Sequence, residues 1–533
     1  MTAKIFVNGS VFTSDDEQPF ANSFISEDGI IIWIGKESEM PEVMGKRIDL
    51  QGKRVIPGFV DSHMHPIILA DCMDKISCLP PEINSIEELK EAVKERTKVI
   101  PNGEWIRGWG YDEEKLDEHR APNRWDLDEV SKEHPVEILR SCSHIRTVNS
   151  KALELAGINR DTPDPQGGEI DRDENGEPTG ILRENARHLI DDILPPKSES
   201  DIVDSIVILG DLLLSQGVVA FADMGSLEIL DYYKYYIKAT EKGLKQSVAL
   251  YYMWDLLKEE LTWDEVRKDK RNQVFNAGLK LVGDGSVGGR TAWMERPYKG
   301  SKNEFGMSVC SEELIDSAIE FCKENQCQLS FHAMGRKTIN RILRKFYDIS
   351  PWTQDVPCLR LEHFTDPSEE AIQMTAEKGI AVSTQAIFIY SEIESYLNNL
   401  GKEWLERTYP MKDMLKAGVK TALSTDAPAT SWAIPSDPFP NIKSAVTRYA
   451  YDGTECGQKN RIDIEDAIKM YTKEGAEICG FRKIGQLKEG YKANFIVLSE
   501  DILNIQKSRI DKVFVEKTYI DGEEVYSKSK IVT

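Results

Sequence analysis

The chain has 533 residues, of which 40% are hydrophobic and 29% charged, a composition typical of a folded globular protein with more than one packed unit. Its 67 basic and 90 acidic residues give a formal net charge of −23, which repels nucleic acid and anionic membrane surfaces. We therefore expect a small-molecule substrate, no nucleic-acid partner and no membrane association, with a homodimer as the assembly to test. The first residues lack a signal-peptide pattern, and a cytoplasmic location is expected.

The two ends of the chain are rich in short β-type runs. Residues 1–56 alternate apolar segments with turns at Asn8-Gly9 and Asp28-Gly29, which are hairpin signals. Residues 484–533 repeat this pattern, with a turn at Asp521-Gly522. Because chain ends often lie close together, we predict one small composite β-sandwich domain built from residues 1–56 and 484–533.

Residues 57–483 follow a different pattern. From residue 200 onward, helical segments alternate with apolar strands, which indicates a parallel sheet covered on both faces. Helices are expected at residues 261–276 and 402–417, among others. Seven such strands follow residue 200, and residues 54–65, "RVIPGFVDSHMH", precede them as an eighth. The predicted fold class is α/β, with a (β/α)8 TIM barrel over residues 57–483.

A long segment separates the first two predicted barrel strands. Residues from about 70 to 200 are rich in Trp, Gly, Pro and charged residues. We expect them to form a large insertion after strand one that covers the active face of the barrel.

Metal-binding residue types fall at the ends of the predicted strands. Four of the eight histidines and one aspartate lie there: His63, His65, His332, His363 and Asp426. Catalytic residues of this fold come from the C-terminal ends of different strands, so these side chains can converge. Imidazole and carboxylate suit zinc or a similar divalent ion. Each residue could instead be an interior polar group with satisfied hydrogen bonds, but half of all histidines at strand ends favours a metal site.

Five motifs resemble those of a known family. In chain order they are "PGFVDSHMHP", "GLKLVGDGSVGGRTA", "FHAMG", "RLEHFTDP" and "STDAPA". This ordered set resembles the amidohydrolase superfamily, and more narrowly its branch of N-substituted formamide deformylases and related metal-dependent hydrolases. The resemblance covers nearly the whole chain.

The resemblance implies one or two divalent ions per chain, with zinc as the expected metal. His63 and His65 would bind the more buried ion, and His332 and His363 would bind the more exposed one. Lys280 would bridge both ions as a carbamate, and Asp426 would bind the buried ion and act as the catalytic base.

Carboxylation of Lys280 also agrees with its surroundings in the sequence. A lysine within an apolar strand is costly as a cation, so its pKa falls and the free amine can take up carbon dioxide. The alternative is an ion pair with Asp284, which shares its strand face.

The implied reaction is hydrolysis of a non-peptide carbon–nitrogen bond, of amide or formamide type, by a metal-activated hydroxide. A deaminase or cyclic-amide hydrolase on the same barrel is an alternative, as is a non-catalytic regulatory protein that retains the fold. The complete ligand set favours an enzyme. His144, Arg290 and Trp293 are candidate substrate-binding residues, although each has a structural alternative as a surface histidine, a salt-bridge partner or a packed aromatic side chain.

Overall fold

The computed structural model describes residues 3–141, 145–195, 197–226, 229, 231–257 and 261–530. The chain forms two compact units, one of residues Met1–Pro66, Ile206–Ala427 and Ser436–Thr533, and one of residues Ile67–Ser205 and Pro428–Pro435. Among the described residues, no helix combines the length and the apolar character needed to cross a membrane.

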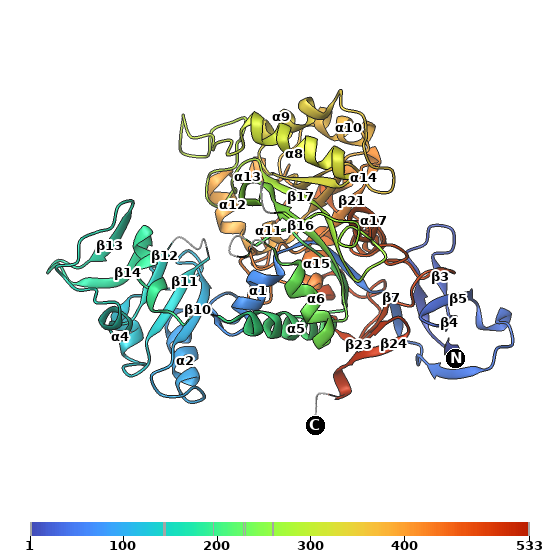
Figure 1. Ribbon diagram of the computed structural model, residues 1–533, viewed down its shortest axis with the longest axis horizontal. Coiled ribbons are helices and arrows are strands. Elements are labelled where there is room, and N and C mark those ends of the chain that lie inside the picture. The colour runs from blue at the N-terminus through green and yellow to red at the C-terminus, as the bar shows by residue number, and fades with distance from the viewer. Residues whose placement is uncertain are drawn as a thin grey trace. The chain divides into compact units, whose positions relative to one another are not determined.

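Eight strands form the central sheet of the first unit (Figure 1), and each pairs in parallel with the next. In order they are β8 (Phe59–Met64), β15 (Val218–Asp223), β16 (Ser247–Met253), β17 (Val274–Val282), β18 (Gln328–Ala333), β19 (Leu359–His363), β20 (Ala381–Thr384) and β21 (Thr421–Leu423). Backbone bonds from His65 N to Ala427 O and from Asp426 N to His63 O, both 2.8 Å, connect the residues after β21 to the end of β8. The predicted (β/α)8 barrel is confirmed.

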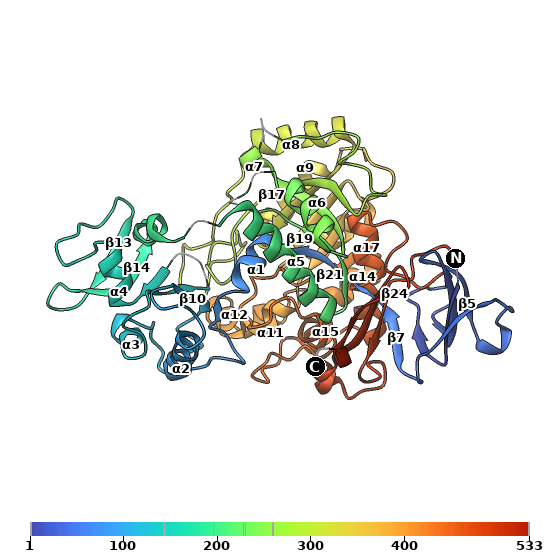
Figure 2. The ribbon, with the colours of Figure 1, turned by 60° about the horizontal axis from the view of Figure 1, so that its bottom comes forward.

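Helices surround the parallel strands (Figure 2). They are α5 (Glu199–Ser215), α6 (Tyr233–Lys242), α7 (Trp254–Leu257), α8 (Glu312–Asn325), α9 (Arg336–Phe346), α10 (Glu369–Glu377), α11 (Ile387–Ser391), α12 (Ile393–Asn399), α13 (Lys402–Leu405), α14 (Met411–Ala417), α15 (Pro438–Thr447), α16 (Ile464–Met470) and α17 (Lys473–Cys479). Their buried apolar side chains pack against the strands, as in α8, where Ile315, Ile319 and Cys322 are buried.

Two helix predictions are wrong in detail. Residues 261–273 form turns instead of a helix, with the Asp264 carboxylate accepting from the amides of Val266 and Arg267, and β17 begins at Val274. The predicted helix 402–417 is divided into α13 and α14. Pro410 lies at the break. Proline interrupts a helix, because it has no amide hydrogen and its ring clashes with the carbonyl four residues earlier.

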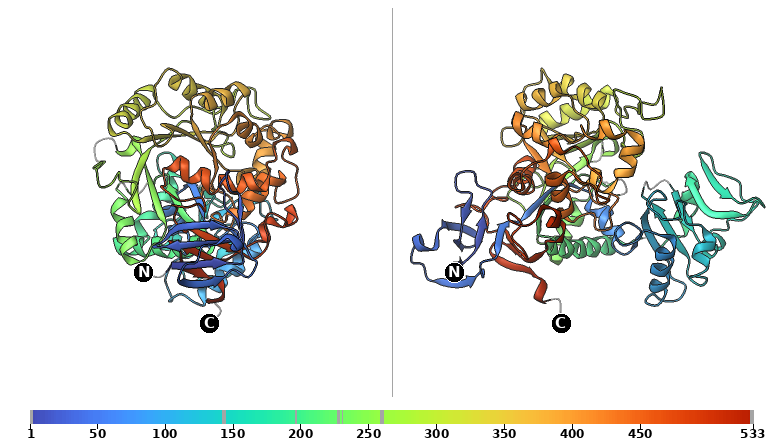
Figure 3. Two further views of the ribbon diagram at one scale, coloured as in Figure 1. Left: turned by 90° about the vertical axis from the view of Figure 1, so that its right-hand side faces the viewer. Right: turned by 180° about the vertical axis from the view of Figure 1, so that it is seen from behind.

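Both chain ends contribute to one six-stranded sheet. Its strands, in spatial order, are β24 (Glu523–Ser527), β23 (Val515–Ile520), β22 (Phe495–Leu498), β7 (Arg54–Pro57), β2 (Ser10–Phe12) and β3 (Phe20–Ala21). β7 pairs antiparallel with β22 and parallel with β2, so C-terminal and N-terminal strands meet at its two edges. Figure 3 shows the blue and red segments side by side.

A second sheet packs on this one. It contains β5 (Ile30–Gly35), β4 (Ser23–Glu27), β1 (Ala3–Val7) and β6 (Gly45–Asp49). The rings of Phe6 and Phe24 stack at 4.7 Å, those of Phe495 and Tyr519 stack at 4.3 Å, and Phe6 meets Phe495 edge-on at 5.0 Å. Aromatic pairs in these geometries stabilise a core beyond the area they bury.

The predicted first strand, residues 54–65, is shared between two sheets. Its first part is β7 of the terminal sheet, and its second part is β8 of the barrel. Gly58 lies between them, where an added Cβ would approach Val219 Cγ1 to 2.4 Å. Only glycine fits this crossing from one sheet to the other.

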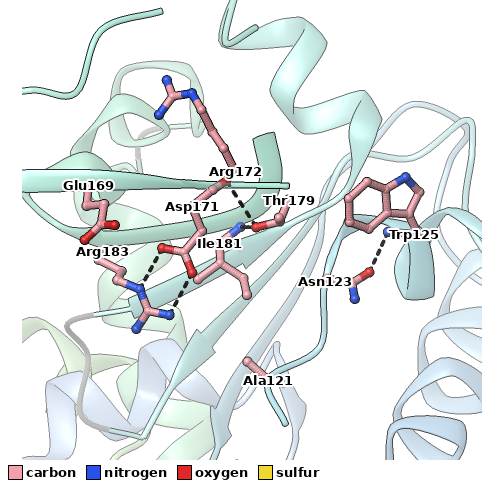
Figure 4. A pocket seen from close by; sticks show the side chains of 9 residues that line it. All are labelled: Ala121, Asn123, Trp125, Glu169, Asp171, Arg172, Thr179, Ile181 and Arg183. Carbon is pink, nitrogen blue, oxygen red and sulfur yellow. Dashed lines mark hydrogen bonds and ion pairs between the residues drawn. The ribbon is translucent and has the colours of Figure 1, made fainter. Parts of the chain in front are cut away.

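The second unit contains its own six-stranded sheet. Its strands, in spatial order, are β13 (Gly168–Arg172), β14 (Pro178–Glu184), β12 (Ile145–Val148), β11 (Val136–Arg140), β10 (Ile106–Tyr111) and β9 (Ile76–Ser77), with helices α1 (Pro66–Cys72), α2 (Ile86–Thr97), α3 (Arg124–Asp128) and α4 (Ser150–Leu155). A cavity of about 400 Å³ lies against β13 and β14 (Figure 4), where Arg183 makes two 2.7 Å bonds to Asp171. The carboxylates of Glu169 and Asp171 line this cavity, and that of Asp171 is paired with Arg183.

Candidate metal centre

The first predicted ligands meet the last one at the C-terminal end of the barrel. His63 is the penultimate residue of β8, His65 follows that strand, and Asp426 follows β21. The Nε2 atoms of His63 and His65 lie 3.2 and 3.4 Å from Oδ1 of Asp426. Ligand atoms of these three residues all lie within 4.8 Å of one another, which is a spacing that one metal ion can bridge.

The other two histidines adjoin this group. His332 and His363 lie at the ends of β18 and β19, and their ring centroids are 4.4 Å apart. The ring of His363 is also 5.1 Å from that of His63, and its Nδ1 is 3.9 Å from Oδ2 of Asp426. The structure therefore brings all four predicted histidines and the aspartate together.

Hydrogen bonds fix the orientation of the first two imidazoles. His63 Nδ1 lies 2.6 Å from Oε2 of Glu362, and His65 Nδ1 lies 2.7 Å from the carbonyl oxygen of Gly225. Both partners are acceptors, so each Nδ1 carries a proton and Nε2 is the ring nitrogen left for a metal ion. Both Nε2 atoms face Asp426.

The remaining two imidazoles are anchored in the same way. His363 Nδ1 lies 2.8 Å from Oε1 of Gln385, whose amide nitrogen donates to Ser424 Oγ, so the glutamine oxygen must accept. His332 donates from Nε2 to the carbonyl oxygen of Gly285 at 3.0 Å, which leaves its Nδ1 as the lone-pair nitrogen. Each of the four rings thus has one nitrogen outside these hydrogen bonds that a metal ion could bind.

Two buried polar atoms in this region have no hydrogen-bond partner, Asp426 Oδ1 and Lys280 Nζ. The aspartate oxygen faces imidazole nitrogens at distances of 3.2 and 3.4 Å without the alignment of a hydrogen bond. A buried anionic oxygen among imidazole nitrogens is satisfied by a cation, either a proton on an imidazole or a metal ion bound by the same groups. The residues present therefore fit a divalent metal ion.

Lys280 lies in β17 and is 3% exposed. Burial lowers the pKa of this amine to about 8, which makes the neutral form readily available. Asp284, the alternative partner, instead accepts from the amides of Met334 and Gly335 at 3.1 and 2.8 Å and from the Thr338 hydroxyl at 2.9 Å. An ion pair between Lys280 and Asp284 is not formed, and carboxylation of the lysine stays a prediction.

The protonation states of Asp426, His332 and His363 suit metal binding. Burial alone would raise the pKa of Asp426, but the facing imidazole of His63 holds it well below its ordinary value. Burial, and then the charge of Lys280, lower the pKa of His332 to about 4, and burial keeps the pKa of His363 well below its usual range. At His65 the effect of burial is outweighed by the hydrogen bond and charge of Asp426, which raise its pKa. An ionised carboxylate and neutral imidazoles are the forms that metals bind.

Backbone strain gathers at the same place. The φ angles of His363, Phe364 and Asp426 are 70°, 51° and 56°, in the left-handed region that favours glycine. Such conformations persist where the surrounding structure enforces them, and they cluster at functional sites. At Asp426, the hydrogen bond from its backbone amide to the carbonyl oxygen of His63 is one such constraint.

The three candidate substrate-binding residues are less informative. The Arg290 guanidinium donates to Glu304 at 2.6 Å and lies over the Tyr298 ring, as expected for a structural ion pair. Trp293 is half-buried with its amide bonded to Asp284. His144 lies outside the described residues. Substrate roles for these three residues stay predictions.

Sequence reasoning missed several residues that support the ligands. The Asp61 carboxylate accepts from the Thr425 hydroxyl at 2.6 Å and from the His63 amide at 3.1 Å, and burial raises its pKa to about 7. Glu362 and Gln385 hold two of the rings. An available signal was a carboxylate one or two residues before a predicted histidine ligand, as in "RLEH" and "FVDSH".

Comparison with known proteins places this arrangement in a family. The amidohydrolase family model matches residues 46–526, and the chain belongs to this family of metal-dependent hydrolases. It is 30% identical to the protein YtcJ of Bacillus subtilis, over 98% of this chain and 99% of that protein. It is 27% identical to an N-substituted formamide deformylase of Arthrobacter pascens, over 98% of both chains. An uncharacterized metal-dependent hydrolase from Pyrococcus horikoshii superposes with a TM-score of 0.73 at 26% identity, covering 95% and 99% of the two chains.

Proposed function

We propose that the chain hydrolyses a non-peptide carbon–nitrogen bond of the amide or formamide type at a metal centre. The proposed metal ligands are His63, His65, Lys280, His332, His363 and Asp426. The observation that carries the proposal is the gathering of imidazole nitrogens around the buried Oδ1 of Asp426, which has no hydrogen-bond partner. Zinc is the metal that best matches such nitrogen and carboxylate ligands.

The proposed ligands would form two groups, one for each ion. His63, His65 and Asp426 would hold one ion, and His332 and His363, with Lys280 as a carbamate between the two, would hold a second. A bound divalent cation supplies Lewis acidity, which lowers the pKa of a water and polarises a carbonyl oxygen.

Asp426 would also move the proton. Its carboxylate is ionised in this setting, so it can accept a proton from the attacking water and pass it to the leaving nitrogen. The constrained backbone at this residue supports the role, because it fixes the carboxylate before substrate arrives.

The substrate class rests on the relatives. The name of the Arthrobacter pascens enzyme gives N-substituted formamides as what that protein acts on. N-formyl amines are therefore the first substrates to test here. The same ligands also suit deamination and opening of a cyclic amide, so those reactions belong in the same experiment.

The test is a panel assay with zinc-loaded protein. N-formyl amines, N-acetyl amines, small lactams and aminated heteroaromatic rings are incubated separately, and formate, acetate, ring-opened acid and ammonia are measured. Release of formate or acetate, lost on chelation and regained with zinc, is the expected result. Ammonia or ring opening as the only product would replace the proposal with one of the alternatives. Turnover unchanged by complete metal removal would contradict it.

A further inference from the structure

An ion pair occupies the interior of the barrel beside the candidate metal centre. Arg360 and Glu362 alternate along β19 with Leu361, so both point to the same face, and both are 0% exposed. Arg360 Nε lies 2.6 Å from Oε1 of Glu362, and its Nη2 lies 3.0 Å from Oε2. The two bonds hold the planar groups side by side.

The carboxylate of Glu362 has no spare oxygen. Oε1 also accepts from the Ser330 hydroxyl at 2.6 Å, and Oε2 accepts from Nδ1 of His63 at 2.6 Å. Each carboxylate oxygen therefore accepts two hydrogen bonds. The group that meets His63 is therefore a fully oriented anion.

Arg360 is itself tied to the strand that carries the histidine. Its Nη2 donates to the carbonyl oxygen of Ser62 at 2.6 Å, and its Nη1 lies 3.2 Å from the Tyr251 hydroxyl. One guanidinium thus holds the carboxylate that binds the His63 ring and the backbone next to His63.

We propose that Glu362, held by Arg360, is a positioning residue for the metal centre. It keeps His63 protonated at Nδ1 and directs the Nε2 lone pair toward the ion, and Arg360 fixes Glu362 in that orientation. The inference rests on the proposed metal site. Replacing a buried ion pair with apolar residues often costs no stability, so orientation of a ligand explains why a charged pair occupies this interior. Carboxylates behind metal-binding histidines typically change metal affinity by roughly 10–100-fold.

The test compares metal affinity among matched variants. Glu362→Gln keeps the size of the side chain but removes the charge, and it leaves Arg360 buried without its counter-ion. The double variant Arg360→Met/Glu362→Gln removes both charges. Asp366→Asn is the control, because Asp366 is a buried carboxylate of the same unit that pairs with Arg336 at 2.8 Å and does not touch a candidate ligand. Affinity for zinc is measured by chelator competition on apoprotein, and Tm is measured alongside.

We expect Glu362→Gln to weaken binding of the tighter ion by roughly 10–100-fold, and Asp366→Asn to leave it within about twofold. The double variant should regain Tm relative to Glu362→Gln without regaining affinity, because a neutral amide cannot replace the anion behind His63. If the double variant binds zinc as tightly as the wild type, Glu362 serves only to neutralise Arg360 and the inference fails.

If the variants do not fold, a measurement on the wild-type protein tests the proposed role of Glu362. In crystals loaded with cobalt, anomalous density should place the ion at Nε2 of His63, with Nδ1 still bonded to Glu362. An ion at Nδ1 of His63 would overturn the inference while leaving the proposed metal enzyme intact. A wild-type protein that binds no ion at His63 would instead overturn both.

Discussion

The backbone amide of Asp426 donates to the carbonyl oxygen of His63 at 2.8 Å, and the side chains of the same two residues face each other at 3.2 Å. The first contact helps to join the last barrel strand to the first one. The second contact forms the centre of the candidate metal site. Closing the barrel and assembling the site are therefore the same structural event, and a change that opens the junction should lose both.

Metal content is the first prediction. Protein purified without chelator should carry about one to two zinc-like ions per chain. The double variant His63→Ala/His65→Ala should lose most of this metal, because two of the three clustered ligands disappear. His188→Ala, which changes an exposed histidine of the other unit, is the matched control. Elemental analysis that finds less than a tenth of an equivalent in wild type, even after reconstitution, would count against the site.

The second prediction separates proton transfer from metal binding. Asp426→Asn should keep at least one ion but lose a factor of roughly 100 or more in kcat, since an amide cannot accept the proton. His332→Asn should act mainly through metal occupancy, so added zinc should restore part of its activity. Both are assayed on the best substrate from the panel. Wild-type kcat in Asp426→Asn, at equal metal content, would assign the proton to another group.

Carboxylation of Lys280 gives the third prediction. Reconstitution of apoprotein with zinc should be slower and less complete in buffer stripped of carbon dioxide, and bicarbonate should restore it. The effect should grow as the pH rises through about 8, because only the neutral amine reacts and burial lowers the pKa of Lys280 to about 8. Lys280→Gln should respond to neither bicarbonate nor pH in this way. Equal responses in wild type and Lys280→Gln would show that no carbamate forms.

The fourth prediction concerns the terminal sheet. Deleting residues 484–533 removes β22, β23 and β24, exposes one edge of β7, and strips Phe495 and Tyr519 from the aromatic core. The truncated protein should aggregate or unfold below the wild-type Tm, because an open strand edge recruits other chains. A truncated chain that stays monomeric and melts cooperatively at the wild-type Tm would contradict this view of the sheet.

Much of the barrel could be predicted because its signals are local. Continuous apolar runs between amphipathic helices indicate buried parallel strands, and the fold itself dictates that residues ending such strands converge. His63, His332, His363 and Asp426 were found in this way. The predicted domain boundary between residues 56 and 57 lies close to the crossing at Gly58. The role of the glycine could not be predicted, because only the packing of Val219 shows why this residue divides β7 from β8.

The supporting residues were hidden for a different reason. Glu362, Gln385 and the Gly225 carbonyl act through hydrogen bonds to side chains distant in sequence, and no periodicity encodes such contacts. Likewise, the turn at Asp264 replaced a predicted helix because side-chain caps compete locally with helical hydrogen bonds.

The segment from Arg54 to Met64 links the terminal sheet to the barrel with a single residue between two strands. This connection is short, and Val219 packs closely against Gly58. It therefore contains no flexible loop that would let the terminal sheet move relative to β8. The sandwich and the histidine-bearing strand should therefore exchange their amide hydrogens as one cooperative unit. A stress applied at the chain termini would then enter the barrel at the first residue of β8 and reach His63 along that strand.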